Sequence, residues 1–479
     1  KLSTVANMRR HRRRLLTQLR NERSSEVDAL IALLRREIDA LRAQNAALRA
    51  DNAELRRRIG LDSSNSSKPP SSDGLKKKLR ILGSLRTRSG KSSGGRKGHR
   101  GDTLRQVADP DRIVDHTARV CQHCSAGLSA GCAIGVERRQ VFDLPARLIE
   151  VTEHRATILC CPRCRGQTRA AFPEGVASPA QYGERIRAAA VYLNAQQLVP
   201  EERVAQILED LFDAAAACGA SVATWVGRRA EALEAVYNAI GARVAVTKVR
   251  CLDETGLRIR GKLNWLHTTS TMAYTFYRAG EPRSAVPEDL QGGVAVHDHW
   301  APYLRLDVEH AFCNAHLLRE LAAVIEFDDE PWAEAMRKLL LDANDVVRQA
   351  KQAGLSALRP QQIRTFEKRY WSAVRQGLAL HRKLPKIEGS PKARGRQKKR
   401  PGHNLLLLCK AFINETLRFL TDFDVPFTNN LAEQDLRMMK VKMKISGGFR
   451  TLEGAIEFAR LRSIISSSRK KGLNILQTL

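Results

Sequence analysis

The chain is short of acidic residues, of long apolar runs and of targeting signals. Asp and Glu number 51 against 81 Lys and Arg, which gives a formal net charge of +30. No apolar run approaches the length of about 20 residues that is needed to cross a bilayer. The N-terminal 20 residues are basic and contain no apolar stretch of the kind found in a signal peptide. Lipidation motifs are also missing. We therefore expect a cytoplasmic protein with no membrane partner.

The composition that is present points to nucleic acid. The 479 residues suffice for two to four domains, and the 43% hydrophobic content is that of an ordinary globular protein. A large positive charge indicates a polyanionic partner, either nucleic acid or an acidic protein. Ten cysteines, two pairs of them in Cys-x-x-Cys form, fit metal binding in a reducing compartment better than a disulfide framework.

Residues 27–61 show the heptad repeat of a coiled coil. One seam consists of Val27, Leu34, Leu41, Leu48 and Leu55, and the other of Ile31, Ile38, Asn45, Asn52 and Ile59. Asparagines buried in such a seam fix its register and favour two parallel strands. We expect a homodimer or a higher oligomer through this segment. The alternative is a single amphipathic helix packed on its own protein.

Basic segments of low complexity flank the predicted coiled coil. Residues 1–26 form a basic arm, in which the first 20 positions hold seven Lys or Arg and no acid. Residues 62–105 form a linker rich in Ser, Pro and Gly, with eleven Lys or Arg between Lys68 and Arg100. Such segments are either solvated and flexible or track DNA phosphates. On the second interpretation, the linker contacts DNA through Arg96, Lys97 and Arg100.

Residues 106–178 contain two Cys-x-x-Cys pairs. The four cysteines are Cys121, Cys124, Cys161 and Cys164. Four thiolates are the ligand set of a structural zinc site, so we expect one Zn²⁺ in this module. The distance between the pairs exceeds that of a short zinc ribbon, and Cys132 and Cys160 are competing ligands. Between the pairs, residues 139–144 and 148–157 are predicted to be strands.

Residues 179–242 are predicted to be helical. Pro200 followed by two glutamates marks a helix start, and Ser221 is the expected N-cap of another helix. Two helices joined by a Gly-containing turn form either a helix-turn-helix that binds DNA or a spacer packed on the next domain. The sequence does not separate these two interpretations.

Residues 243–310 change to the period of a β-sheet. The expected strands are 244–252, 263–269, 273–277 and 294–297. The first strand is predicted to end at Asp253 and the fourth at Asp298. A meander of three strands followed by a crossover to a fourth is the order of an RNase H-like sheet, in which the first and fourth strands are neighbours. We therefore expect Asp253 and Asp298 to lie at the same end of the sheet.

The rest of the chain is predicted to be helical. Residues 311–422 form an insertion with a basic loop, in which Arg382–Arg400 hold nine Lys or Arg. Residues 423–479 return to the core with a helix that carries Glu433 and ends at a Gly-Gly pair. The fold class is thus multidomain α/β, with an RNase H-like mixed sheet that is interrupted by a helical insertion. A coiled coil, a zinc-binding module and a helical domain precede it.

Several motifs occur together in one order. They are Asp253–Gly256, His297–Trp300, Cys313–His316, Val425–Glu433 and Lys444–Arg450, preceded by a Ser-Ser-Lys-Pro-Pro-Ser-Ser-Asp string and the paired cysteines. Together they resemble the transposases of insertion sequence family 66, and the resemblance extends over nearly the whole chain from the coiled coil onward. The chain departs from the family pattern at Thr428, Gln434 and His299, none of which belongs to the acidic set.

The resemblance implies a metal-dependent DDE transposase of a bacterial insertion sequence, located in the nucleoid. In this chain Asp253, Asp298 and Glu433 take the catalytic roles. They would hold two Mg²⁺ or Mn²⁺ ions about 4 Å apart, with Asp253 bridging, Asp298 on one ion and Glu433 on the other. The enzyme would cleave the element ends by hydrolysis and transfer the freed 3′-OH ends to target DNA. Accessory proteins encoded by the element are further candidate partners.

Two neighbouring acids compete with this assignment. Glu254 should point to the opposite face of the strand from Asp253, because side chains alternate along a strand. Asp435 should point about 200° away from Glu433 around the helix. Both are therefore expected to lie outside the metal site.

Basic residues near Glu433 are expected to lie along DNA phosphates. They are Arg437, Lys440, Lys442, Lys444 and Arg450. Such contacts supply affinity rather than sequence reading, and Arg437 alternatively pairs with Glu433 one turn away. Two other functions compete with transposition: a non-catalytic zinc-containing DNA-binding protein, and an RNase H-like nuclease without strand transfer. The complete acidic set argues against the first, and the dimerising segment argues against the second.

Overall fold

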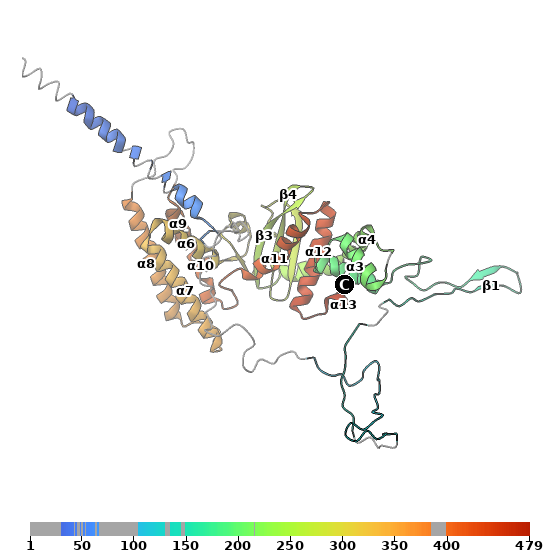
Figure 1. Cartoon of the computed structure of the whole chain (residues 1–479). Helices are drawn as coiled ribbons and strands as arrows, with labels where there is room; N and C mark the ends of the chain where they lie inside the picture. Colours follow the sequence, from blue (N-terminus) through green and yellow to red (C-terminus); the bar gives the residue numbers. More distant parts are fainter. Residues whose placement is uncertain are drawn as a thin grey trace, which may run out of the picture. The chain divides into compact units, whose positions relative to one another are not determined.

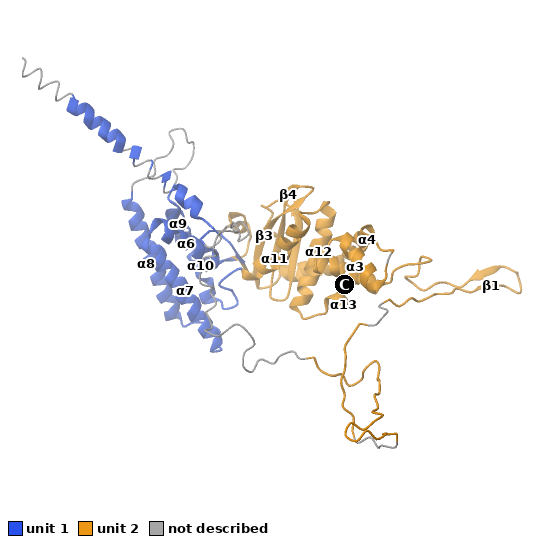
Figure 2. Ribbon diagram, viewed as in Figure 1, with its two compact units in different colours: residues 1–82, 296–299, 310–429 blue, residues 83–295, 300–309, 430–479 orange. Residues whose placement is uncertain are grey.

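The computed structural model describes residues 30–42, 44–45, 48, 51–52, 54–62, 65–66, 104–129, 135–144, 149–214, 216–384 and 399–479 (Figure 1). Figure 2 shows the two compact units of the chain. Unit 1 comprises Lys1–Leu82, Val296–His299 and His310–Asn429, and unit 2 comprises Gly83–Ala295, Trp300–Glu309 and Asn430–Leu479. Among the described residues, no helix is both long enough and apolar enough to cross a membrane.

A five-stranded mixed sheet runs in the order β5-β4-β3-β6-β7. Its strands are β3 (Val249–Ile259), β4 (Lys262–Ser270), β5 (Thr275–Glu281), β6 (Val294–His297) and β7 (Glu309–Phe312). The first three form an antiparallel meander. The fourth begins beside the first, because the Val294 N–H donates to the Lys248 carbonyl at 2.7 Å. The predicted neighbourhood of the first and fourth strands is confirmed. The residues of β6 and β7 are divided between the two units.

The first strand differs from its predicted position. Helix α5 (Glu234–Ala245) takes up the start of the expected strand, and β3 continues to Ile259. It continues because Arg260 and Gly261, with φ of 50° and 76°, form a two-residue hairpin turn into β4. Asp253 therefore lies within β3 and not at its end. The edge strand β7 was not predicted, because we expected helix from residue 310 onward.

Two C-terminal helices cover one face of the meander (Figure 1). They are α11 (Asn430–Ser446) and α12 (Leu452–Lys470); α11 carries Glu433 and ends at the Gly-Gly pair, as predicted. The core between them and the sheet includes Leu257, Ile259, Leu266, Tyr277, Leu436, Met439, Phe458 and Ala459. Burial of each large apolar side chain of this kind contributes about 1.5–3 kcal/mol to stability.

Buried serines of α12 complete the hydrogen bonding of β5, which lies at the edge of the sheet. The Tyr277 N–H donates to Ser463 Oγ at 2.9 Å, and the Thr275 N–H donates to Ser467 Oγ at 3.0 Å. An edge strand exposes unpaired N–H groups that can pair with another chain. These hydroxyls satisfy those groups, which explains why a helix face turned toward the core is rich in serine.

A close backbone contact fixes the end of α11 against β3. Gly447 has a φ of 69° and ends the helix. A Cβ at Gly448 would meet the Arg258 carbonyl oxygen at 2.6 Å, so a side chain there would push the two segments apart. The Phe449 N–H then donates to that same carbonyl at 2.8 Å, and the Arg260 N–H donates to the Phe449 carbonyl at 3.0 Å. The Gly-Gly pair thus joins the C-terminal end of α11 to the C-terminal end of β3.

A helical segment of unit 2 precedes the sheet. It consists of α2 (Glu184–Val191), a π-helical turn (Tyr192–Gln196), α3 (Glu201–Phe212) and α4 (Gly219–Ala232), followed by α5. The predicted start after Pro200 is confirmed. Ser221 is not an N-cap, since α4 begins at Gly219 with Cys218 as its N-cap residue. Its hydroxyl instead lies 3.4 Å from Cys218 Sγ.

The cysteine module of unit 2 has less regular structure than predicted. Residues 139–144, and those of 148–157 that the structure describes, contain no strand. The strands that form are β1 (Ile158–Cys160) and β2 (Gln167–Arg169), which pair on either side of the second cysteine pair. In the expected strands, Val141 is 90% and Val151 71% exposed. Alternating apolar residues form a strand only when one face is buried, and these residues have no surface to pack on.

Unit 1 is a bundle of helices, as predicted for the insertion. Its helices are α6 (Asn314–Asp328), α7 (Pro331–Gln352), α8 (Pro360–Lys383), α9 (Pro401–Ala411) and α10 (Ile413–Thr421). Trp332 and Tyr370 are fully buried in it, and the Tyr370 hydroxyl donates to the Cys409 carbonyl at 2.9 Å. The basic loop was expected between α8 and α9, and most of it lies outside the described residues.

The N-terminal helix of unit 1 is anchored on α6. Arg57 forms an ion pair with Asp328, and a Cβ at Gly60 would lie 2.5 Å from the Phe327 ring. Asn65, within the segment expected to be a linker, is 3% exposed and donates to Glu326 Oε2 at 3.0 Å. The described seam residues of this helix are exposed in the single chain, among them Leu34 at 48% and Leu41 at 54%. Pairing of that seam in a coiled coil stays a prediction.

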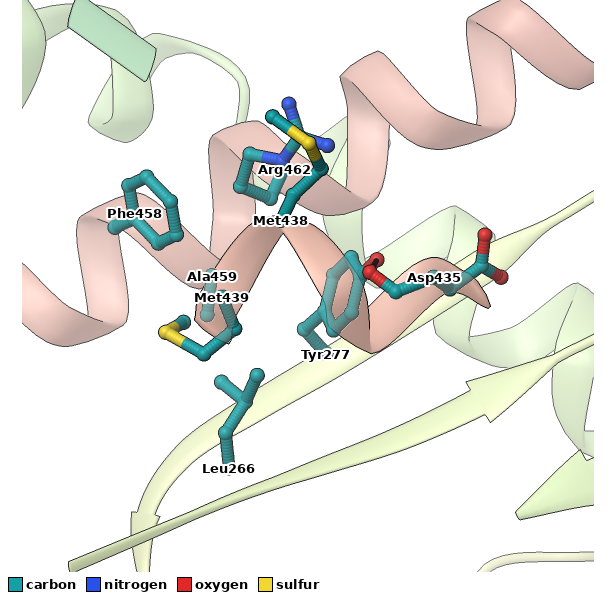
Figure 3. A pocket seen from close by; sticks show the side chains of 8 residues that line it. All are labelled: Leu266, Tyr277, Asp435, Met438, Met439, Phe458, Ala459 and Arg462. Carbon is teal, nitrogen blue, oxygen red and sulfur yellow. Dashed lines mark hydrogen bonds between the residues drawn. The ribbon is translucent and has the colours of Figure 1, made fainter. Parts of the chain in front are cut away.

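A buried ion pair ties α11 to α12 and to the sheet. Asp435 accepts hydrogen bonds from Ser270 Oγ at 2.5 Å, Thr275 Oγ1 at 2.8 Å and Lys470 Nζ at 2.8 Å. The Asp435 and Lys470 side chains are each 14% exposed. Figure 3 shows the Asp435 carboxylate directed away from Met439 and Phe458. The cavity beside these side chains has a volume of about 10 Å³, enough for one water at most. Asp435 is therefore a structural residue.

We expect Asp435→Ala to lower the free energy of unfolding by about 2–4 kcal/mol, because the Lys470 ammonium would then be buried without a carboxylate. Asp435→Asn, which keeps an acceptor, should cost less. Urea denaturation followed by tryptophan fluorescence measures both, with Gln434→Ala on the exposed side of the same turn as the control. Equal stability of Asp435→Ala and Gln434→Ala would show that the pair does not support the fold.

Candidate functional site

Asp253 lies on the face of β3 that α11 covers. Side chains alternate along a strand, so Asp253 shares a face with Leu257 and Ile259. These two residues pack against Leu436 and Met439 of α11. The pairing of β3 with β4 is regular from residue 251 to residue 259, so no bulge changes this alternation. Asp253 is half-buried and accepts a hydrogen bond from the Glu254 N–H at 2.9 Å.

Glu433 is in the first turn of α11. It is half-buried, and Leu436, three residues later, packs into the core between α11 and the sheet. Residues three apart lie on the same side of a helix, so the Glu433 side chain is on the sheet side of α11. Asp253 and Glu433 both belong to unit 2, and both are directed to the interface between β3 and α11. The structure therefore places two of the three predicted acids on the facing sides of β3 and α11.

Glu254 lies on the opposite face of β3, as expected. Its carboxylate is 4% exposed and accepts from Tyr303 Oη at 2.6 Å and from Arg283 Nη2 at 3.0 Å. The Arg283 guanidinium is held between two indole rings, 4.7 Å from the Trp265 centroid and 4.6 Å from that of Trp300. These contacts fix the Asp253–Glu254 segment on the face of β3 that is opposite to α11. Glu254 is thus occupied in a structural ion pair.

Asp298 directly follows β6 and belongs to unit 1. Histidines precede and follow it. His297 Nε2 lies 3.0 Å from His310 Nδ1, and burial lowers the pKa of His297 to about 3. His299 packs edge-on against Phe312, and burial lowers its pKa to about 4. Both imidazoles are therefore neutral at physiological pH, and the sequence beside Asp298 provides no cation.

Glu320 of α6 is an acid near Asp298 that the sequence analysis missed. Burial raises the pKa of Glu320 to about 7, with a further rise from the charge of Asp298 and an opposing effect from Arg319. His316 lies one turn earlier on α6, and burial lowers its pKa to about 3. The spacing of His316 and Glu320 on one helix face was the available sequence signal, but it is common in ordinary helices.

Two of the sequence motifs meet at the start of α6. The Cys313 N–H donates to the His297 carbonyl at 2.8 Å, and Cys313 Sγ accepts from the Asn429 N–H at 3.1 Å. The Asn314 N–H donates to the Phe427 carbonyl at 3.1 Å. The Cys-Asn-Ala-His motif thus binds, within unit 1, both the end of β6 and the segment that leads into α11. Its buried residues have a clear structural role.

The predicted phosphate contacts on α11 fall into two groups. Arg437, Lys440, Lys444 and Arg450 are exposed. Lys442 is 6% exposed, and its amine lies 5.9 Å and 5.8 Å from the ring centroids of Phe449 and Phe458. Burial lowers the pKa of Lys442. The prediction that Lys442 follows DNA phosphates does not fit this position, because periodicity alone did not reveal the two rings. Arg96, Lys97 and Arg100 lie outside the described residues.

The two Cys-x-x-Cys pairs form the same backbone turn. The Ser125 N–H donates to the Cys121 carbonyl at 2.9 Å, and the Arg165 N–H donates to the Cys161 carbonyl at 2.8 Å. Ser125 and Arg165 both have a positive φ, of 60° and 56°. Backbone N–H groups lower the pKa of Cys121, chiefly that of Cys124, and the pKa of Cys161, chiefly that of Cys164. Each turn therefore favours a thiolate.

The competing cysteine ligands are not equivalent to these four. Cys160 Sγ lies 3.4 Å from the Arg165 carbonyl, at the end of β1 and outside the turn. Cys132 lies outside the described residues. Among the described residues, no three of Cys121, Cys124, Cys161 and Cys164 lie close enough together to hold one metal ion, so a shared zinc site stays a prediction.

Comparison with known families accounts for most of the chain. Residues 16–105 match a family of unknown function (DUF6444), and no curated protein matches the chain. Residues 179–457 match the model of the family described as Transposase IS66 family, a match that covers more than half of the chain and includes Asp253, Asp298 and Glu433. The chain therefore belongs to the IS66 transposase family.

Proposed function

We propose that this chain cuts DNA at the ends of an insertion sequence and joins those ends to target DNA, with Asp253, Asp298 and Glu433 as its catalytic carboxylates. Family membership indicates a DNA-processing transposase. The observation that carries the detailed proposal is the common orientation of Asp253 and Glu433 toward the interface of β3 and α11. The sequence supplies the third member, since Asp298 directly follows the strand that begins beside β3.

The dimensions of the two elements support this pairing. The end of α11 is fixed to the end of β3 through Phe449 and Arg258. From the end of α11 at Ser446, Glu433 lies about 20 Å back along the helix, at about 1.5 Å per residue. From Arg258, Asp253 lies about 17 Å back along the strand, at about 3.3 Å per residue. The two carboxylates are thus proposed to stand at a similar level.

The donor set fits divalent metal ions. Mg²⁺ prefers carboxylate oxygens and retains water, and when bound it would polarise the scissile phosphodiester and stabilise the leaving oxygen. Asp253 and Glu433 would orient the ions from a strand and a helix that are packed rigidly together. Asp435 and Glu254, which have cationic partners of their own, would take no part. The same constellation serves hydrolysis at the element end and attack by the freed 3′-OH.

Exposed basic residues on α11 and just after it would hold the DNA backbone. Arg437, Lys440 and Lys444 lie on α11 between the turn of Glu433 and the Gly-Gly pair, and Arg450 follows that pair. A row of cations on one helix neutralises successive phosphates and supplies affinity without reading sequence. Arg96, Lys97 and Arg100 of the linker would add further contacts of this kind, whereas Lys442 is left out because it is buried.

Each cysteine pair would contribute half of one structural zinc site. The two matching turns, with their lowered thiol pKa values, support Cys121, Cys124, Cys161 and Cys164 as the four ligands. Zn²⁺ would stabilise a segment that has little apolar core, because its described apolar residues are mostly exposed. This module would then present a folded surface to DNA.

The N-terminal helix would join two copies of the chain. Its described seam residues are exposed in the single chain, and the seam includes two asparagines that favour a parallel pair. Transposition requires the coordinated processing of two DNA ends, so two linked active sites would serve the reaction. Accessory proteins of the element are compatible with this arrangement.

Asp253→Asn is expected to reduce cleavage by several orders of magnitude and to leave DNA affinity unchanged or slightly higher. A metal ligand is lost, while removal of a negative charge does not weaken phosphate binding. Cleavage is followed with labelled element ends and Mg²⁺, and binding is followed without metal. Asp289→Asn, an exposed acid changed in the same way, is the control. Cleavage at the wild-type rate by Asp253→Asn would refute the assignment, and cleavage by wild type without end joining would favour a simple nuclease.

One zinc ion per chain is expected in freshly purified protein, and the double variant Cys121→Ser with Cys164→Ser should lose it. Two ligands would be missing from a tetrahedral site. Elemental analysis gives the metal content. Cys218→Ser, at an exposed cysteine outside the module, should keep full zinc. Zinc retained by the double variant would assign the ion to other ligands.

Wild-type protein without DNA is expected to be dimeric in light scattering. Replacement of Leu34, Leu41 and Leu48 by lysine should give monomers that bind single ends but form no paired-end complex, because charges would enter the apolar seam. Lysine at Ala32 and Asp39, on the outer face of the same helix, should leave the dimer intact. A monomeric wild type, or normal end pairing by the triple variant, would contradict this role of the helix.

A further inference from the structure

A cavity lined by arginines lies between α2 and α4 in unit 2, and none of Asp253, Asp298 and Glu433 lines it. Its volume is about 200 Å³. Glu184, Arg187 and Val191 line it from α2, and Trp225, Arg228 and Arg229 line it from α4. On each helix these residues are three or four positions apart, so they form two stripes that face one another. The cavity therefore results from the packing of the two helices.

The cavity is electropositive, and its only acid in the lining is solvent-exposed. Glu184 accepts from Arg187 Nη1 at 2.9 Å and from Arg229 Nη2 at 2.8 Å. The Glu184 side chain is 70% exposed, whereas those of Arg187 and Arg229 are 27% and 26% exposed. An ion pair that is this accessible to water contributes little to stability. Glu184 thus bridges the partly buried guanidinium groups of Arg187 and Arg229 through ion pairs that contribute little to stability.

A third arginine adds positive charge at the edge of the cavity. Arg228, one turn beyond Trp225, is exposed at the rim. With Arg187 and Arg229 it gives three guanidinium groups against the single carboxylate of Glu184, and this excess of positive charge favours an anionic ligand. Arginine is well suited to an oxyanion of phosphate, which it can bind with two N–H groups.

We propose that this cavity binds a backbone phosphate of DNA, with Glu184 occupying the phosphate position in the free protein. The inference rests on the proposed function, since it takes DNA as the ligand. In the complex, Arg187 and Arg229 would turn from the Glu184 carboxylate to the phosphate oxygens, and Arg228 would approach from the rim. The volume is below the roughly 300–1,000 Å³ of pockets for whole small molecules, which favours a single phosphate group over a cofactor. The helical segment is thereby assigned to DNA contact and not to a spacer.

The test uses full-length protein, a fluorescent duplex of random sequence, and EDTA to prevent cleavage. Binding is measured by fluorescence anisotropy over a series of KCl concentrations. Arg228→Ala is expected to weaken binding several-fold and to reduce the slope of log K against log [KCl] by about 0.9, the value for one lost phosphate contact. Glu184→Gln should act in the opposite direction and strengthen binding, because an internal competitor for the arginines is removed.

Matched controls separate the cavity from general charge effects. Arg185→Ala removes an exposed arginine of α2 outside the cavity, and Glu209→Gln removes an exposed acid of α3. Both should change binding less than their cavity counterparts, and Arg185→Ala should leave the salt slope unchanged. Equal effects of Arg228→Ala and Arg185→Ala, or of Glu184→Gln and Glu209→Gln, would overturn the proposal.

A free anion is the other possible source of phosphate. If inorganic phosphate bound the protein only when Arg228 is present and left DNA affinity unchanged relative to chloride at equal ionic strength, the cavity would belong to a free anion and the DNA assignment would be wrong. The outcome is independent of catalysis, since no divalent metal is present. Cleavage that depends on Asp253, together with an unchanged salt slope in Arg228→Ala, would reject the cavity alone. The reverse result would reject the catalytic assignment alone.

Discussion

The contact between the end of α11 and the end of β3 is the constraint on which the candidate site depends. Gly448 lets the two backbones approach, and the hydrogen bonds of Phe449 then fix the helix along the strand. The apolar residues between α11 and β3 keep this face closed. A helix attached at one end by backbone and along its length by apolar packing has little freedom to slide. The orientation of Glu433 relative to Asp253 therefore follows from residues that carry no catalytic chemistry.

Two acids beside the proposed catalytic carboxylates have their own cations. Asp435 is paired with Lys470 on one side of the meander, and Glu254 is paired with Arg283 on the other. The Asp435 and Glu254 side chains are 14% and 4% exposed, and a carboxylate that is this shielded from water is costly to leave without its partner. Such pairing keeps these two carboxylates away from metal ions in a protein where acids are scarce. The chemistry proposed for the site thus depends on which acids are paired with cations as well as on which acids are proposed to bind metal.

The sequence predicted much of this arrangement, but only where the signal was local. Alternating apolar residues placed β4 and β6 well, and the helical period with its Gly-Gly end placed α11. The start of β3 was missed because Val244 and Ala245 suit a helix as well as a strand, and tertiary packing decides. Burial of Lys442 depends on two phenyl rings brought close by folding. The arginine cavity forms because α2 and α4 pack against one another. Residue spacing along the chain therefore could not predict either the burial of Lys442 or this cavity.

The anchoring of the N-terminal helix on α6 has a mechanical consequence. Arg57, Gly60 and Asn65 attach the end of that helix to the last turn of α6 at three contacts. Tension or torque applied along the N-terminal helix would pass into α6, and Cys313, the residue before α6, holds the end of β6 through its hydrogen bond to the His297 carbonyl. The length of α6 then acts as a lever arm of about 20 Å, at about 1.5 Å per residue. A force applied at one end of the bundle would therefore reach Asp298, the residue that directly follows His297.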